Sequence, residues 1–124
     1  MKKLILPFLL VLSNAAFADT KLTEDQMKGL IPGNSVDGFA DALGKNYKAY
    51  YSPDGVLVQL LEGKMKRKGT WKIEGDQFCT QFPTEKSKCT FIYRTDAGEY
   101  KRVKDDGMQT NTMKKFAKGN AFNL

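Results

Sequence analysis

The sequence contains no histidine. Histidine is the commonest general base and the commonest metal ligand, so its absence removes the usual routes to acid–base catalysis and metal binding. The chain also lacks a G-x-S-x-G motif, a P-loop and metal-spaced cysteines. Asp54-Gly55 and Asp105-Asp106-Gly107 resemble fragments of calcium loops, but the spacing of an EF-hand is missing, so we interpret them as turns. We therefore expect a protein that is not an enzyme and has no catalytic residue, metal or cofactor.

Long apolar runs are absent except near the N-terminus. There Lys2 and Lys3 precede a short apolar run over residues 4–12, and an Ala-Phe-Ala cleavage motif ends at Ala18. The run is too short to span a bilayer, so we expect no transmembrane anchor. The sequence predicts a secretory signal peptide over residues 1–18 and a periplasmic, or secreted, protein.

Charge of either sign is moderate. Twenty Lys and Arg residues against fourteen Asp and Glu residues give a formal net charge of +6, which falls by two when Lys2 and Lys3 are removed. A charge of this size is ordinary for a soluble domain. Residues 19–124 are enough for one domain, which we expect to be a monomer. Nucleic acid is not expected as a partner of an exported protein, whereas a small ligand, an anionic glycan, a lipid head group or an acidic envelope protein stays open.

Only two cysteines are present, Cys79 and Cys89. Two cysteines in an oxidising compartment most often pair. Pro83 to Lys86 form a turn between them, and two strands closing around that turn would bring their Cβ atoms together. A redox pair is the alternative, but the spacing is not C-x-x-C and no neighbour would stabilise a thiolate. The sequence therefore predicts a structural disulfide.

The pattern along the chain predicts one short helix followed by strands. Thr23 can cap the helix and Gln26 occupies the capping-box position, with an end near Gly29. Beyond Gly33, apolar–polar alternation and turn sequences replace the helical period. We predict strands over residues 34–37, 45–51, 56–61, 64–73, 77–82, 87–94, 99–104 and 108–115.

Short strands joined by tight turns at about ten-residue spacing are typical of all-β sandwiches and barrels. The connections are too short for parallel crossovers. We therefore predict an all-β antiparallel meander, a small up-and-down barrel or half-barrel with one N-terminal helix at one end. In detail we expect a loop over residues 38–44 and a frayed tail over residues 119–124. The continuous apolar run over residues 56–61 indicates burial on both faces or a position near the closure of the sheet.

Three motifs also occur together in this chain. They are Leu22-Thr23 leading to Gly33-Asn34, the turn Tyr50-Tyr51-Ser52-Pro53-Asp54-Gly55, and Gly69-x-Trp71-x-Ile73-x-Gly75-Asp76-x-Phe78-Cys79 followed by Cys89 and Asp105-Asp106-Gly107. In this combination the chain resembles a family of small exported bacterial proteins of unknown function. The resemblance covers nearly all of residues 19–124. It implies export and a lipocalin-like β meander, but it supplies no activity, since the shared residues are mostly turn glycines, aromatics and cysteines.

The segment over residues 64–73 alternates between two faces. One face carries a basic set of side chains, Lys64, Lys66, Lys68 and Lys72, together with Thr70. The other carries Met65, Arg67, Gly69, Trp71 and Ile73. We interpret the lysines as a solvated face that discourages pairing between sheet edges, and the alternative is a ridge that meets an anionic surface. Trp71 is expected to be a largely buried core anchor.

Arg67 is unusual because a charged side chain on an inward face must be paired or hydrogen-bonded. It either binds a carboxylate or phosphate of a ligand or extends to the barrel rim. The tyrosines either fill the core or line a pocket. The candidate ligand-binding residues are Arg67, Trp71, Tyr47, Tyr51 and Tyr93.

These observations predict a small soluble envelope protein that binds a small or amphipathic ligand. The alternative is a protein-interaction or inhibitor-like module that uses the basic sheet face. A cavity separates the two, because a ligand-binding barrel needs an interior void on the order of several hundred Å³. An interaction module would instead have a filled core and an exposed patch.

Overall fold

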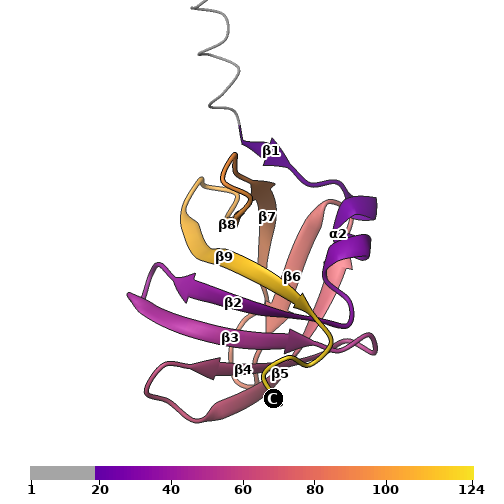
Figure 1. Ribbon diagram of the computed structural model, residues 1–124. Coiled ribbons are helices and arrows are strands. Elements are labelled where there is room, and N and C mark those ends of the chain that lie inside the picture. The colour runs from indigo at the N-terminus through magenta and orange to yellow at the C-terminus, as the bar shows by residue number, and fades with distance from the viewer. Residues whose placement is uncertain (1–18) are drawn as a thin grey trace, which may run out of the picture.

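The computed structural model describes residues 19–124, and the predicted signal peptide lies outside the described residues (Figure 1). Within residues 19–124, one short helix and nine strands follow one another. They are β1 (Thr20–Lys21), α2 (Glu24–Leu30), β2 (Asn34–Ala40), β3 (Lys45–Tyr51), β4 (Val56–Leu61), β5 (Lys66–Glu74), β6 (Gln77–Gln81), β7 (Lys88–Arg94), β8 (Tyr100–Val103) and β9 (Gln109–Lys118).

The strands form a closed antiparallel barrel. Each strand from β2 to β8 pairs with the next strand along the chain. Strand β9 then pairs with β2 along the whole length of β2, which closes the barrel. The predicted all-β up-and-down meander is therefore confirmed, and the barrel is complete rather than half-open. The sequence pattern did not predict the two-residue strand β1. It pairs with the end of β7, at Tyr93 and Arg94, whereas β6 pairs with the start of β7.

The helix begins as predicted, with Thr23 as its cap. The Thr23 hydroxyl accepts from the Gln26 N–H at 3.2 Å, and the Gln26 side chain accepts from the Thr23 N–H at 2.8 Å. This reciprocal pair satisfies two backbone donors that a helix start leaves open. Met27 and Ile31 are fully buried in the core, so α2 closes the end of the barrel at which β5 turns into β6 (Figure 1).

A disulfide joins Cys79 and Cys89, as predicted. The two cysteines lie directly opposite each other in the β6–β7 pair. Inward positions on the same strands carry core residues, and Phe78 and Ile92 are both fully buried. Since side chains alternate along a strand, the disulfide lies on the outer side of the barrel wall.

The prediction of a loop over residues 38–44 is wrong in its first part, because β2 continues to Ala40. Gly38 lies in the middle of this strand, opposite Tyr47 on β3 and Met113 on β9. A Cβ atom at position 38 would lie 2.7 Å from the Tyr47 ring and from the backbone oxygen of Thr112. The glycine therefore marks a close approach between neighbours inside the sheet, not a break in the strand.

Three further expectations need correction. Strand β5 begins at Lys66, so Met65 does not face inward and is 87 % exposed. Residues 56–61 are not buried on both faces: only Leu57 is fully buried, because the outer face of β4 has no covering layer. The start of the tail is not frayed, because Gly119 donates to the Gly33 carbonyl at 2.9 Å and Ala121 donates to the Ser35 hydroxyl at 3.0 Å.

Candidate functional site

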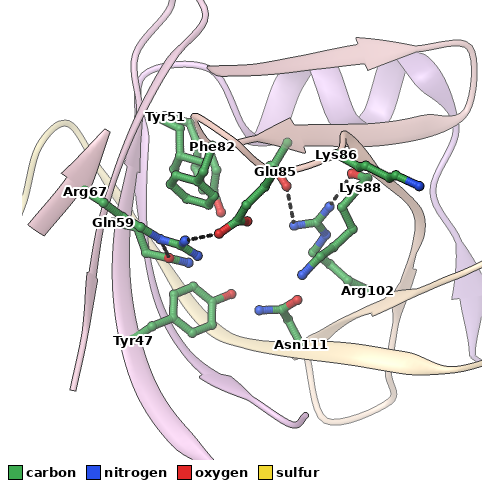
Figure 2. Close-up of a pocket in the computed structure, with 12 residues that line it drawn as sticks. Tyr47, Tyr51, Gln59, Arg67, Phe82, Glu85, Lys86, Lys88, Arg102 and Asn111 are labelled. Atoms are coloured by element: carbon green, nitrogen blue, oxygen red, sulfur yellow. Dashed lines mark hydrogen bonds and ion pairs between the residues drawn. The ribbon is translucent and has the colours of Figure 1, made fainter. Parts of the chain in front are cut away.

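A small polar pocket opens into the barrel at the end where β6 passes to β7, the end opposite α2 (Figure 2). Its volume is about 50 Å³, so this interior pocket falls well short of the several hundred Å³ that we expected of a barrel that encloses its whole ligand. One water needs roughly 10–15 Å³ by this measure, so the pocket has room for a few waters or one compact polar group. The residues that line it are Tyr47, Tyr51, Leu57, Gln59, Arg67, Thr80, Phe82, Glu85, Lys86, Lys88, Arg102 and Asn111.

Arg102 forms the inner wall of the pocket. Tyr100 and Arg102 are the inward positions of β8, and Arg102 lies opposite the buried Ile92 with only 4 % of its surface exposed. Its Cζ atom lies 4.6 Å from the centre of the Phe78 ring, and burial lowers the pKa of the guanidinium. An arginine keeps its charge in proteins even so. The barrel interior therefore contains a fixed positive charge.

Hydrogen bonds hold the Arg102 side chain in place. Nε donates to the Thr90 hydroxyl at 2.8 Å and Nη1 donates to the Thr80 hydroxyl at 3.3 Å. Nη2 donates to the backbone carbonyls of Phe78 and Lys88, both at 3.3 Å. All these acceptors are neutral, and none of the ion pairs found in residues 19–124 includes Arg102. A guanidinium has five N–H groups, so one Nη1 N–H is left over.

Tyr47 contributes an unpaired hydroxyl to the same pocket. The side chain is 2 % exposed, and within residues 19–124 its Oη atom makes no hydrogen bond of ordinary length and angle. The Asn111 side chain lies beside it and lowers the pKa of the phenol, as a group that donates toward the oxygen does, so the Tyr47 O–H itself has no acceptor. Figure 2 shows the hydroxyl directed into the pocket beside Asn111. Burial raises the pKa of Tyr47 well above its ordinary value, and the positive charge of Arg102 opposes that rise. The hydroxyl is therefore neutral and able to donate a hydrogen bond at any physiological pH.

Arg67 and Glu85 form the mouth of the pocket. Arg67 Nη1 lies 2.8 Å from Glu85 Oε2, and Arg67 Nε donates to the Gln59 side chain at 3.1 Å (Figure 2). The Arg67 guanidinium also stacks on the Phe82 ring, 3.6 Å from its centre. About half of each side chain is exposed, so Arg67 extends to the rim and is paired there with a carboxylate.

The pocket is electropositive. Arg67, Lys86, Lys88 and Arg102 line it, against the single carboxylate of Glu85. The pKa of Lys88 is lowered, first by burial and then by the positive charge of Arg102. Cations crowded together in this way favour an anion, particularly where one of them is shielded from water.

The structure brings three of the five candidate ligand residues together, namely Tyr47, Tyr51 and Arg67. Trp71 lies on the inner face beside Tyr51, with ring centres 6.1 Å apart, but it does not line this pocket. Trp71 packs partly buried against the core, and its Nε1 atom donates to the Ser52 carbonyl at 2.9 Å.

The fifth candidate, Tyr93, is not part of the pocket. It alternates with the buried Ile92 along β7, so its side chain lies on the outer face, where β1 pairs beside it. Sequence reasoning missed Arg102 and Glu85. One signal could have identified Arg102: it lies two positions after Tyr100, so both side chains share one face of a strand. The neighbouring charges in residues 101–104 made this face look solvent-exposed.

The basic set lies outside the barrel. Lys66, Lys68 and Lys72 occupy exposed outward positions of β5, and Lys64 is exposed in the preceding turn. An apolar hollow of about 520 Å³ adjoins Lys68 where β5 and β6 separate. Its walls include Val56, Phe82 and Pro83. Positive charge and apolar surface therefore lie next to each other on this outer face.

Glu74, Cys79 and Cys89 are the one close group of metal-ligand types among the described residues. Both sulfur atoms belong to the disulfide, so neither is available as a thiolate ligand. This group is therefore a disulfide with a carboxylate beside it.

Comparison with known protein families, with curated proteins and with solved structures gave no match to this chain. Within residues 19–124, no helix is long and apolar enough to cross a membrane.

Proposed function

We propose that this protein is a small binding domain of the bacterial envelope and that the Arg102 pocket holds an anionic group of a small or amphipathic ligand. The observation that carries the proposal is that, within residues 19–124, the buried Arg102 has no carboxylate partner and shares its pocket with the buried Tyr47 hydroxyl, whose O–H has no acceptor. Buried charges are ordinarily paired and buried polar groups ordinarily bonded. A ligand anion would satisfy both groups.

The free donors have the right character for such a ligand. Among the described residues, one Nη1 N–H of Arg102 and the Tyr47 O–H have no acceptor. Both are donors, and hydrogen bonds to an ionised oxygen are roughly twice as strong as neutral ones. Carboxylates and phosphates are the anionic groups whose geometry a guanidinium fits best.

The size of the pocket limits what enters it. A cavity of about 50 Å³ accepts a head group and not a whole drug-sized molecule, which needs several hundred Å³ or more. The rest of the ligand would therefore leave through the mouth beside Arg67 and Phe82. A compact anionic group with a short organic substituent is the ligand that the geometry fits.

The test uses Tyr47→Phe and a panel of small anions: acetate, methyl sulfate and methyl phosphate, with acetamide as the uncharged control. We expect at least one anion to shift the resonances of pocket residues in NMR titrations, and acetamide to shift none. Tyr47→Phe should weaken that binding severalfold and yet raise the free energy of unfolding by about 1 kcal/mol, because it removes an unpaired buried hydroxyl. Absence of binding by every anion would contradict the proposal.

We also propose export to the periplasm and membership of the family of small exported proteins that the sequence resembles. The signal-like residues 1–18 support export. The Cys79–Cys89 disulfide supports it as well, because disulfides persist in oxidising compartments. Mass spectrometry of the protein from a bacterial periplasm should find Asp19 as the first residue and no free thiol.

A second candidate function, an interaction or inhibitor-like module, is favoured by the apolar hollow beside Lys68. An acidic partner with an exposed apolar side chain would fit this surface. Changing Lys64, Lys66 and Lys68 together to Glu should then abolish capture of the partner without lowering the melting temperature. Binding should also weaken as salt rises, because exposed charges are screened beyond about 8 Å at physiological ionic strength. Capture that the triple variant retains would exclude this face.

A further inference from the structure

Glu85 lies at the mouth of the pocket and is the last residue of a tight turn. The Glu85 N–H donates to the Phe82 carbonyl at 3.0 Å, with Pro83 and Thr84 as the central residues. Thr84 has a φ of +67°, at the position where such turns normally place glycine or asparagine. A β-branched residue is strained there, so the loop between β6 and β7 is held in an unfavourable conformation.

The Glu85 carboxylate is the one negative side chain of the pocket, and it is weakly held. Its only side-chain partner in the described part of the chain is Arg67. The pair is about half exposed, and ion pairs of that kind contribute little to stability. The carboxylate can therefore leave the mouth at small cost.

The charge balance shows which anion would replace it. With Glu85 in place, Arg67 is compensated and Arg102 is not. A ligand with one negative charge that displaced Glu85 would only restore the same balance. A ligand with two negative charges would compensate both arginines, while Lys86 and Lys88 stand nearby on the loop and on β7.

We infer, building on the proposed function, that the ligand's head group is a phosphate monoester dianion that displaces the Glu85 carboxylate from Arg67. A phosphate concentrates two charges and three acceptor oxygens in one compact group, which suits a pocket of about 50 Å³. A dicarboxylate separates its charges along a longer chain. The oxygens would accept from Arg67, from the Arg102 Nη1 N–H and from the Tyr47 hydroxyl.

The decisive experiment compares methyl phosphate with methyl sulfate by isothermal titration calorimetry at a series of pH values. Both probes are tetrahedral, but methyl sulfate keeps one charge throughout, whereas a phosphate monoester gains its second charge near pH 6. We expect the affinity for methyl phosphate to rise about tenfold between about pH 5 and about pH 7.5, as that second charge forms. The affinity for methyl sulfate should stay flat.

The protein is well suited to this comparison because it has no histidine. The charged or titratable groups that face the ligand are Tyr47, Tyr51, Arg67, Glu85, Lys86, Lys88 and Arg102. A change in the charge of any of them would alter the affinity for both probes. Only a change in the charge of the ligand itself alters the affinity for methyl phosphate alone.

The Glu85 displacement is tested with Glu85→Gln. Removing the competing carboxylate should tighten methyl phosphate binding at least fivefold. Glu74→Gln is the matched control, because Glu74 is also an exposed carboxylate near a cation, with Lys72 Nζ at 3.5 Å, but lies outside the pocket. It removes the same charge and should leave the affinity unchanged.

A further experiment distinguishes two sources of the same phosphate head group, a free metabolite and a membrane lipid. Glycerol 3-phosphate represents a free metabolite, and phosphatidylcholine vesicles that contain phosphatidic acid represent a membrane lipid. Vesicles with phosphatidylglycerol, a phosphodiester, are the control. Flotation with the phosphatidic acid vesicles alone would identify a lipid, and calorimetric binding of glycerol 3-phosphate alone would identify a free phosphate ester.

The outcomes distinguish the two proposals. Equal, pH-independent binding of both probes would overturn the dianion inference and leave the anion-binding function in place. An unchanged affinity for methyl phosphate in Glu85→Gln would overturn the displacement. If neither probe binds to the wild type or to Glu85→Gln, then both the proposed function and this inference are wrong.

Discussion

The ring of Tyr47 packs against the Cα atom of Gly38, directly across the β2–β3 pair. No other residue type fits at position 38 without a shift, because a Cβ atom there would lie 2.7 Å from the ring. The contact directs the Tyr47 side chain inward and brings its hydroxyl to the pocket. A glycine in the barrel wall thus positions a residue of the candidate site.

Gly38→Ala should lower the free energy of unfolding by about 1–3 kcal/mol, the usual cost of overpacking a filled interior. Chemical denaturation measures this change, and NMR should show displaced Tyr47 resonances. Gly29→Ala is the control, since Gly29 lies in α2 with open space around its Cα atom. That change should stabilise the protein by about 0.5–1 kcal/mol, because glycine is unfavourable inside a helix. Equal effects of the two changes would refute the role of Gly38.

Cys89→Ser should lower the free energy of unfolding by about 2–4 kcal/mol, because the disulfide restricts the unfolded chain. The barrel wall around the Cys79–Cys89 pair should otherwise keep its structure. Urea denaturation of the oxidised wild type and of the variant gives the difference. A variant as stable as the wild type would show that the bridge adds nothing to the fold.

Trp71→Phe should lower stability by about 1 kcal/mol, because the hydrogen bond from Nε1 to the Ser52 carbonyl is lost while most ring contacts remain. The native protein should have a blue-shifted emission maximum and only partial quenching by acrylamide, because the indole packs against the buried rings of Tyr51 and Phe78 and keeps some exposure. Emission typical of a fully solvated indole would contradict this position of the ring.

The protein should become less stable at alkaline pH. Burial raises the pKa of Tyr51 to about 12, and the pKa of Tyr47 is also raised well above 10. Below the unfolded pKa of about 10, both phenols are protonated in both states and stability does not depend on them. Above that pH the unfolded chain releases its protons first, so stability falls by up to about 1.4 kcal/mol per pH unit for each phenol.

Denaturation between about pH 9 and about pH 12, the interval set by the ordinary and the raised pKa, measures this loss. Tyr51→Phe should make the curve less steep, whereas Tyr93→Phe, on the outer face, should not. If both variants lose as much stability at alkaline pH as the wild type does, then groups other than Tyr51 cause the loss.

Local patterns predicted the helix, most strands, the meander and the disulfide, because each depends on neighbours in sequence. The closure of the barrel was left open, since the β2–β9 pair joins residues far apart along the chain. Gly38 was interpreted as part of a loop, because its compensating contact with Tyr47 comes from another strand. A glycine that belongs to a strand for this reason can be identified only when the residue that packs against it is known.

The candidate site was predicted in part for the same reason. Alternation placed Arg67 on the inner face, and Tyr47 and Tyr51 share a face of β3. The sequence does not single out Arg102, because the four residues 101–104 include three cations. Its burial depends on acceptors from β6 and β7, and no pattern within β8 contains that information.

Strand β9 bridges β2 and β8, so it covers the last open edge on each side of the sheet. A chain shortened before Gln109 would keep seven of the barrel strands and expose two unpaired edges at once. Unpaired edges are templates for pairing between molecules. Proteolytic loss of the last ten-residue strand would therefore turn a self-contained barrel into a species prone to aggregation.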